Sequence, residues 1–240
     1  MRITQQTKTF YIFIVLALGL ATSWLFPITR SWWDTADYAT FAFLNGTLRN
    51  RETWQLILTL ASLNTAKIVI GFFMSIFYLH YLFYGKNNST LQRFVELCTL
   101  TIIAAVGIIL IKIFIHTGID YHRRSPSLTI NEAFRLSHVF PGYHIRDASA
   151  NSFPGDNAIV LFSWTGILWF LGKKAYGIPA TMFALIFTLP RLISGAHWLS
   201  DVIIGGGAIS LITLAFTLHT SYLKSILNLT FKRYYEYKKI

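Results

Sequence analysis

A series of long apolar segments, separated by short polar loops, constrains this chain more than any other feature. Six stretches are long enough to cross a hydrocarbon core of roughly 30 Å as helices. A chain in lipid must satisfy its backbone hydrogen bonds internally, so we expect an all-α membrane protein with six transmembrane helices. We also expect one membrane-embedded domain over residues 1–240, with both termini on one side. The predicted spans cover about 10–28, 66–84, 94–116, 157–172, 176–193 and 201–222.

The composition supports a membrane protein and argues against several other classes. Of the 240 residues, 54% are hydrophobic and 13% are charged, which is too apolar for a soluble domain of this length. The net charge of +11 does not indicate a nucleic-acid partner, because the basic residues lie in short loops and form no stripe. Membrane lipids are the expected partners. The single cysteine, Cys98, excludes an internal disulfide.

The distribution of lysines predicts the orientation of the helices. Lysine is retained on the cytoplasmic side of membrane proteins, and in this topology eight of the ten lysines, all except Lys67 and Lys112, fall on one side. We therefore expect a cytoplasmic face with both termini on it, and an outer face rich in arginine and acidic residues. A basic aromatic tail at 231–239 is expected to rest on the anionic cytoplasmic leaflet. The lysines assigned to the cytoplasmic side are Lys8, Lys86, Lys173, Lys174, Lys224, Lys232, Lys238 and Lys239.

The segment between the fifth and sixth predicted spans contains a candidate nucleophile. His197 and Asp201 are four residues apart, so on a helix they share a face, where a carboxylate can fix the imidazole tautomer and leave the other nitrogen free to attack. Arg191 precedes them across a short turn and can bind the same anion. A hydrogen-bonded pair at the membrane interface is the alternative interpretation.

The outer loop at about 117–156 contributes two further stretches. Ser152, Gly155 and Asp156 precede the fourth span, where backbone N–H groups and the helix dipole favour an anion, although a plain helix cap has the same pattern. Arg123 and Arg124 follow the third span, and solvated surface arginines are the alternative there.

Taken together, these stretches resemble the type 2 phosphatidic acid phosphatase superfamily, a six-helix membrane fold with three short motifs at one membrane face. The third motif, Arg-x5-His-x3-Asp, is complete, and the second, Pro-Ser-Gly-His, lacks its histidine. The first, Lys-x6-Arg-Pro, has histidine at the lysine position and its proline displaced. Over about residues 117–207 the amino-acid sequence most resembles the lipid A 1-diphosphate synthase family. The positions that match the third motif are Arg191, His197 and Asp201. Those that match the second are Pro154, Gly155, Asp156 and Asn157, and those that match the first are His116, Arg123 and Pro126.

The resemblance implies an enzyme of the bacterial inner membrane that transfers the terminal phosphate of undecaprenyl diphosphate to lipid A at the periplasmic face. His197 is expected to form a phosphohistidine, with Asp201 orienting it and Asn157 at the position of the general acid. No metal and no cofactor are expected. The implied phosphate-binding residues are Arg123, Arg124, Arg191, Ser152, Gly155, Asp156 and His116.

Asn157 leaves alternatives open, because an amide cannot replace a general acid worth about 10²–10⁴-fold in rate. A diphosphate donor tolerates this loss, since its leaving group is a phosphate with a second pKa of roughly 6. His138 and His144 in the outer loop are candidate substitute acids. The other hypotheses are a phosphatase that uses water as acceptor, a lipid-phosphate-binding protein without activity, and a transporter, for which Glu96 and Lys112 give weak support.

Overall fold

The computed structural model describes residues 5–86, 89–119 and 121–219, and this part of the chain contains helices but no strand. It confirms the predicted all-α membrane fold. The elements are α1 (Gln5–Leu25), α2 (Pro27–Gly46), α3 (Glu52–Ser62), α4 (Ala66–Tyr84), α5 (Thr90–Phe114), the π-helical η1 (Ile115–Ile119), α6 (Pro126–Thr129), α7 (Leu136–Val139), α8 (Asp156–Ile193), the π-helical η2 (Asp201–Ala208) and α9 (Ile209–His219).

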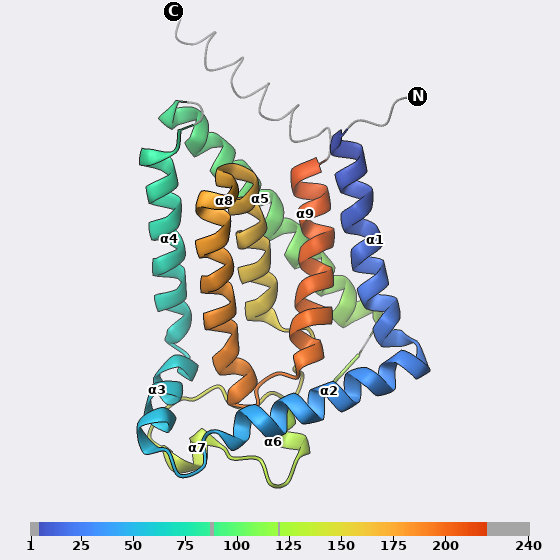
Figure 1. Cartoon of the computed structure of the whole chain (residues 1–240), viewed down its shortest axis with the longest axis vertical. Helices are drawn as coiled ribbons and strands as arrows, with labels where there is room; N and C mark the ends of the chain where they lie inside the picture. The colour runs from blue at the N-terminus through green and yellow to red at the C-terminus, as the bar shows by residue number, and fades with distance from the viewer. Residues whose placement is uncertain (1–4, 87–88, 120, 220–240) are drawn as a thin grey trace, which may run out of the picture.

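Five helical segments in the described residues are long and apolar enough to cross a membrane. One of them, α8, breaks at Lys173, where φ is 50° and ψ is −141°, and Figure 1 shows that it doubles back into two adjacent legs. Thr165 on the first leg donates a hydrogen bond to the Ala180 carbonyl on the second, 3.3 Å away. The predicted spans 157–172 and 176–193 are therefore the two legs of α8. The total of six membrane spans stays a prediction. The end of the predicted last span, 220–222, and the tail at 231–239 lie outside the described residues.

The end of the bundle that carries the 117–156 loop, called the outer end after its predicted side, also carries two helices, α2 and α3, that the sequence analysis did not predict. Helix α2 begins with Pro27, whose fixed φ suits a first helical position. It lies across the end of the bundle, beneath α9 and α8 (Figure 1). Its buried residues, Asp37, Phe41 and Asn45, recur every four positions and so form one stripe facing the protein. This stripe brings a carboxylate into the interior.

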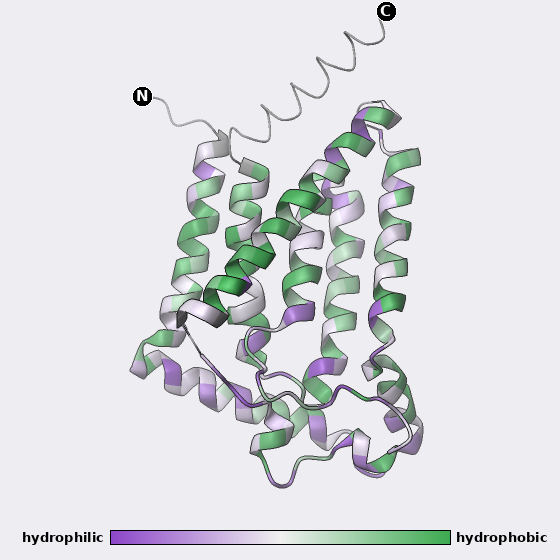
Figure 2. Ribbon diagram, turned by 180° about the vertical axis from the view of Figure 1, so that it is seen from behind, coloured by the Kyte–Doolittle hydropathy of each residue, from purple (hydrophilic) through white to green (hydrophobic). Residues whose placement is uncertain are grey.

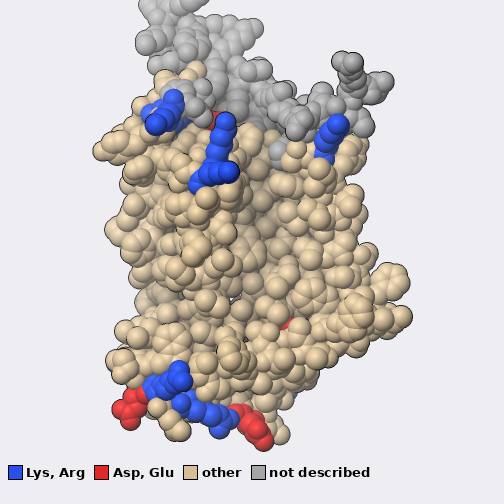
Figure 3. Space-filling model, viewed as in Figure 1, with Lys and Arg blue, Asp and Glu red and all other residues tan. Residues whose placement is uncertain are grey.

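The distribution of polar residues agrees with a membrane location. Figure 2 shows hydrophobic residues along the long helices and hydrophilic ones in the loops at the end where α2 lies. On the face seen in Figure 3, lysine, arginine and acidic side chains gather at the two ends and leave the belt between them almost free of charge. Together with the five apolar helices, this identifies a multi-pass membrane protein.

The outer loop is a folded segment that packs under the bundle. The Ser125 N–H donates to the Ser149 carbonyl at 3.0 Å and so joins the two sides of the loop. Asp147 is buried and its carboxylate accepts hydrogen bonds from the Ser137 N–H at 2.9 Å and from Arg135 at 3.3 Å. These bonds fold the loop on itself, and the Ser127 N–H, which donates to the Gly195 carbonyl at 3.2 Å, joins it to the turn before η2, where the candidate site lies.

Candidate active site

A cleft at the outer end of the bundle brings together residues from two of the three predicted stretches. The start of α8, the end of its second leg and the turn before η2 form its walls. From the predicted site residues it includes His197, Asn157, Asp156 and Arg191. The complete lining is Arg146, Ala148, Ser149, Asn151, Phe153, Pro154, Asp156, Asn157, Arg191 and His197.

The side chain of His197 is held in one tautomer. Its Nδ1 lies 2.8 Å from the carbonyl oxygen of Ser152. A carbonyl only accepts hydrogen bonds, so Nδ1 carries the proton and Nε2 keeps its lone pair. Burial, with the positive charge of Arg191 adding to it, lowers the pKa of His197 to about 4. The imidazole is therefore neutral at neutral pH and Nε2 is a nucleophile.

The structure differs here from the expectation that Asp201 fixes this tautomer. The Asp201 carboxylate lies 3.9 Å from Nδ1, which is too far for a hydrogen bond, and a neutral imidazole forms no ion pair with it. Asp201 instead accepts hydrogen bonds from the Trp198 N–H and from Arg123, each at 2.8 Å. It holds the turn that carries His197 through the Trp198 N–H and lies close to the imidazole without a hydrogen bond to it.

Gly195 makes the turn that brings Arg191 and His197 together. Its φ of +78° is unfavourable for any residue with a side chain. A Cβ there would lie 2.8 Å from Phe41 and 3.0 Å from the Cβ of Ser127. The tight turn lets the backbone N–H of His197 donate to the Arg191 carbonyl at 3.2 Å. Guanidinium and imidazole therefore enter one cleft from neighbouring turns of the chain.

The start of α8 supplies part of the predicted anion site. The N–H groups of Asp156 and Asn157 have no carbonyl one turn earlier within the helix. Gly155 and Ser152 are already engaged, since their N–H groups donate to the carbonyls of Asp201 at 3.0 Å and Arg123 at 2.6 Å. Both residues thus act here as structural links between the loop and the site, and their predicted contact with phosphate stays a prediction.

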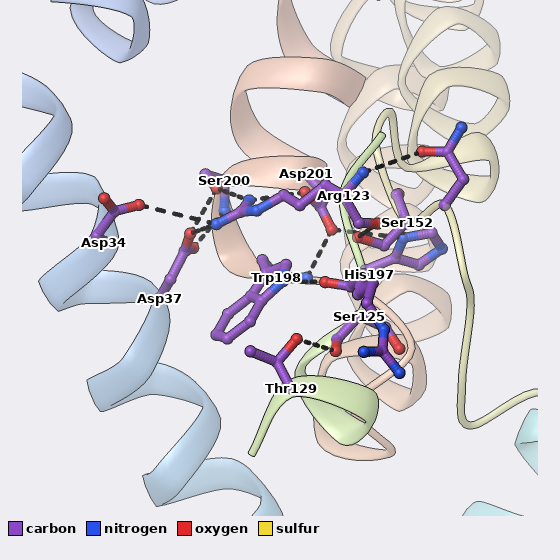
Figure 4. Close-up of polar contacts among 12 residues, drawn as sticks. Asp34, Asp37, Arg123, Ser125, Thr129, Ser152, His197, Trp198, Ser200 and Asp201 are labelled. Carbon is purple, nitrogen blue, oxygen red and sulfur yellow. Dashed lines mark hydrogen bonds and ion pairs between the residues drawn. The ribbon is translucent and has the colours of Figure 1, made fainter. Parts of the chain in front are cut away.

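Arg123 lies outside the cleft, in a cluster of buried acidic groups (Figure 4). Its guanidinium donates to Asp37 at 2.7 Å, to Asp201 at 2.8 Å and to the Ser200 hydroxyl at 2.7 Å. The carbon of the guanidinium lies 5.0 Å from the centre of the Trp198 ring. Two carboxylates that are 0% exposed neutralise this cation within the protein.

Three further predicted residues, Arg124, His138 and His144, are not in the lining of the cleft. Arg124 is exposed, and its carbonyl accepts a hydrogen bond from the Trp198 indole at 2.8 Å. His138 and His144 are also exposed and contribute no lining to the cleft. His116 belongs to η1, but its side chain lies outside the described part of the structure.

Two residues were missed by the sequence analysis. Asp37 joins α2 to Arg123 and to the N–H and hydroxyl of Ser200, and its position on the stripe with Phe41 could have indicated that it is buried. Arg146 lines the cleft beside Arg191, yet no motif or periodicity in the sequence marks it.

Comparisons with known proteins give one relationship that spans most of the chain. No family model and no solved structure matches. The lipid A 1-diphosphate synthase of Escherichia coli (strain K12) is 28% identical over 210 residues, which covers 86% of this chain and 85% of that protein. The similarity therefore extends well beyond the short motifs, through the helices and the outer loop alike. This chain is a distant relative of lipid A 1-diphosphate synthase.

Proposed function

We propose that this protein transfers the terminal phosphate of undecaprenyl diphosphate to the 1-phosphate of lipid A through a phosphohistidine at His197. The observation that carries the proposal is the Nε2 atom of a neutral imidazole in a cleft that also holds two guanidinium groups. A nucleophile among cations suits attack on an anionic phosphoryl group. The relationship to a synthase named for lipid A supports the choice of substrates.

In the first step, Nε2 of His197 forms a bond to the terminal phosphorus, and the bond from that phosphorus to the bridging oxygen breaks. The bonding electrons leave with undecaprenyl phosphate. In the second step, an oxygen of the lipid A 1-phosphate attacks the phosphohistidine, and the P–N bond breaks to restore the imidazole. Arg191 and Arg146, which line the cleft, neutralise charge on the transferred group.

Asn157 lines the cleft at the place where the superfamily has a general acid. Its amide can donate a hydrogen bond but cannot protonate a leaving group. Undecaprenyl phosphate leaves as a stable anion, because the second pKa of a phosphate ester is roughly 6. An alkoxide, the leaving group from a simple monoester, needs that proton. The proposal therefore includes a preference for diphosphate donors.

We place the cleft on the periplasmic side of the inner membrane, with both termini in the cytoplasm. Lys86 and Lys173 line a groove at the opposite end of the bundle from the cleft, where the hairpin of α8 lies (Figure 1). Lysine at that end fits the retention of positive charge on the cytoplasmic side.

Dependence on the acceptor tests the proposal. Purified protein in detergent receives undecaprenyl diphosphate labelled in the terminal phosphate, with or without lipid A. We expect label to move to lipid A, with little release as free phosphate when lipid A is absent. Release at the same rate without lipid A would instead identify a phosphatase that uses water as acceptor.

A further inference from the structure

Arg146 has a fixed backbone and a side chain that forms no hydrogen bond or ion pair with the described residues. Its N–H donates to the Ser62 carbonyl at 2.9 Å, and its carbonyl accepts a hydrogen bond from the Arg191 guanidinium. The neighbouring Ile145 forms an antiparallel bridge with Leu63 after the end of α3. In contrast, the Arg146 guanidinium makes no hydrogen bond or ion pair with any residue that the structure describes. The main chain is held at both sides while the charged group lies free in the cleft.

Arg191, which lines the cleft, also has unused hydrogen-bonding capacity. The residue is 6% exposed, and its Nε is buried without a hydrogen-bond partner among the described residues. An unpartnered charged donor is costly to bury, and a bound anion that accepts from this guanidinium would offset that cost.

The charges that line the cleft do not balance. Asp156 is the acidic residue in the lining, and its carboxylate is 2.7 Å from the ammonium of Lys112. Among the described residues, no carboxylate forms an ion pair with Arg146 or Arg191, and the two acids that act on Arg191 from further away, Asp147 and Asp156, are paired with Arg135 and Lys112. Two close cations in a partly buried site favour an anion of two or more charges.

We propose that Arg146, together with Arg191, binds the diphosphate of the donor substrate, in the role that the family resemblance gives to Arg123. This inference rests on the proposed function, which identifies the diphosphate donor as undecaprenyl diphosphate. Arg123 is less suited to the role because Asp37 and Asp201 already neutralise its charge and engage one donor each. A forked guanidinium on a fixed backbone can bind two phosphate oxygens at once, which a lysine cannot.

Inorganic pyrophosphate provides a test that does not require turnover. We would measure its dissociation constant for the full-length protein in detergent, beside Arg146→Gln, Arg146→Lys and Arg51→Gln. Arg51 is an exposed arginine at the same end of the bundle and outside the cleft, so it is the matched control. We expect Arg146→Gln to weaken binding by about tenfold to a hundredfold, Arg146→Lys to recover part of that loss, and Arg51→Gln to bind as the unmodified protein does.

Unchanged affinity in Arg146→Gln would overturn the inference, as would a lack of pyrophosphate binding by the unmodified protein. A second contradictory result would be an Arg123→Gln variant that keeps its thermal stability but loses affinity, since that would make Arg123 the ligand. The proposed function fails separately. If Arg146→Gln loses pyrophosphate while the unmodified protein transfers no phosphate to lipid A, the anion site stands and the assigned reaction does not.

Discussion

Two arginine sites lie at the outer end of this protein and differ in how their charge is balanced. Arg123 is held between two carboxylates that are 0% exposed, so its charge is neutralised within the protein. Arg146 and Arg191 share the cleft with His197 and form no ion pair with a carboxylate among the described residues. The comparison teaches that motif position alone does not assign a role. The neutralised Arg123 joins parts of the fold, and we propose that the uncompensated pair binds the substrate anion.

Removal of a buried carboxylate should have the largest effect. We expect Asp37→Ala to destabilise the protein by about 3–5 kcal/mol, because Arg123 and the Ser200 N–H then lose a buried partner. Unfolding in mixed micelles measures the change. Asp34→Ala is the control, since Asp34 is 3.9 Å from Arg123 with a side chain 42% exposed, and should cost less than about 1 kcal/mol. Equal losses in both variants would contradict the assignment of Arg123 to the fold.

Restoring a general acid should change the activity of the cleft without affecting the neutralised cluster of Arg123, Asp37 and Asp201. We expect Asn157→His to raise hydrolysis of a lipid phosphate monoester by about a hundredfold, because an alkoxide leaving group gains a proton donor. Transfer from undecaprenyl diphosphate should change little, since its leaving group departs as an anion. Parallel assays of labelled phosphate with both donors give the comparison. Equal gains would show that leaving-group protonation does not explain the preference for diphosphates.

The glycine turn joins the two regions, so a substitution there tests whether they are coupled. Gly195→Ala should destabilise the protein by about 1–2 kcal/mol, because a Cβ is unfavourable at a φ of +78° and would meet Phe41. Gly142→Ala, in the outer loop with no atom within 4 Å of the added Cβ, should leave stability unchanged. Unfolding of the two variants in the same micelles separates the outcomes, and equal stability would mean that the turn is not strained.

The smallest expected effect is the response to mild acid. The pKa of His197 is lowered to about 4, so the neutral nucleophile persists as the pH falls. Transfer with saturating donor should change by less than about twofold between pH ~7.5 and ~5.5, and decline only toward pH ~4. A roughly tenfold loss over that range would indicate a histidine with an ordinary pKa and would contradict the buried, singly hydrogen-bonded imidazole.

Much of the fold follows from the sequence, because long apolar segments in lipid have little choice but to form helices. Helix α2 was not predicted, since it is amphipathic and lies across the bundle. The turn with Arg191 and His197 is local in sequence, and its motif spacing was enough to place both side chains at one site. Arg146 could not be found this way, because its position depends on pairing between segments that are far apart, such as Leu63 and Ile145.

Arg123 shows a different limit of sequence reasoning. Its place in a motif predicts a phosphate ligand, and this role stays a prediction; the partner that neutralises it, Asp37, comes from a helix 86 residues earlier in the chain and could not be found from the motif. Charge balance in the folded protein depends on such distant pairs. A motif records which residue types are present and not which of them are already paired.

Detection of the covalent intermediate tests the central claim most directly. The protein and its His197→Ala variant would be mixed with undecaprenyl diphosphate labelled in the terminal phosphate, quenched under alkaline conditions that preserve phosphohistidine, and digested to locate the label. The account predicts acid-labile label on the peptide that contains His197 and none on the variant, whose thermal stability is measured in parallel. Transfer to lipid A by His197→Ala at the rate of the unmodified protein, or label on another residue, would contradict it.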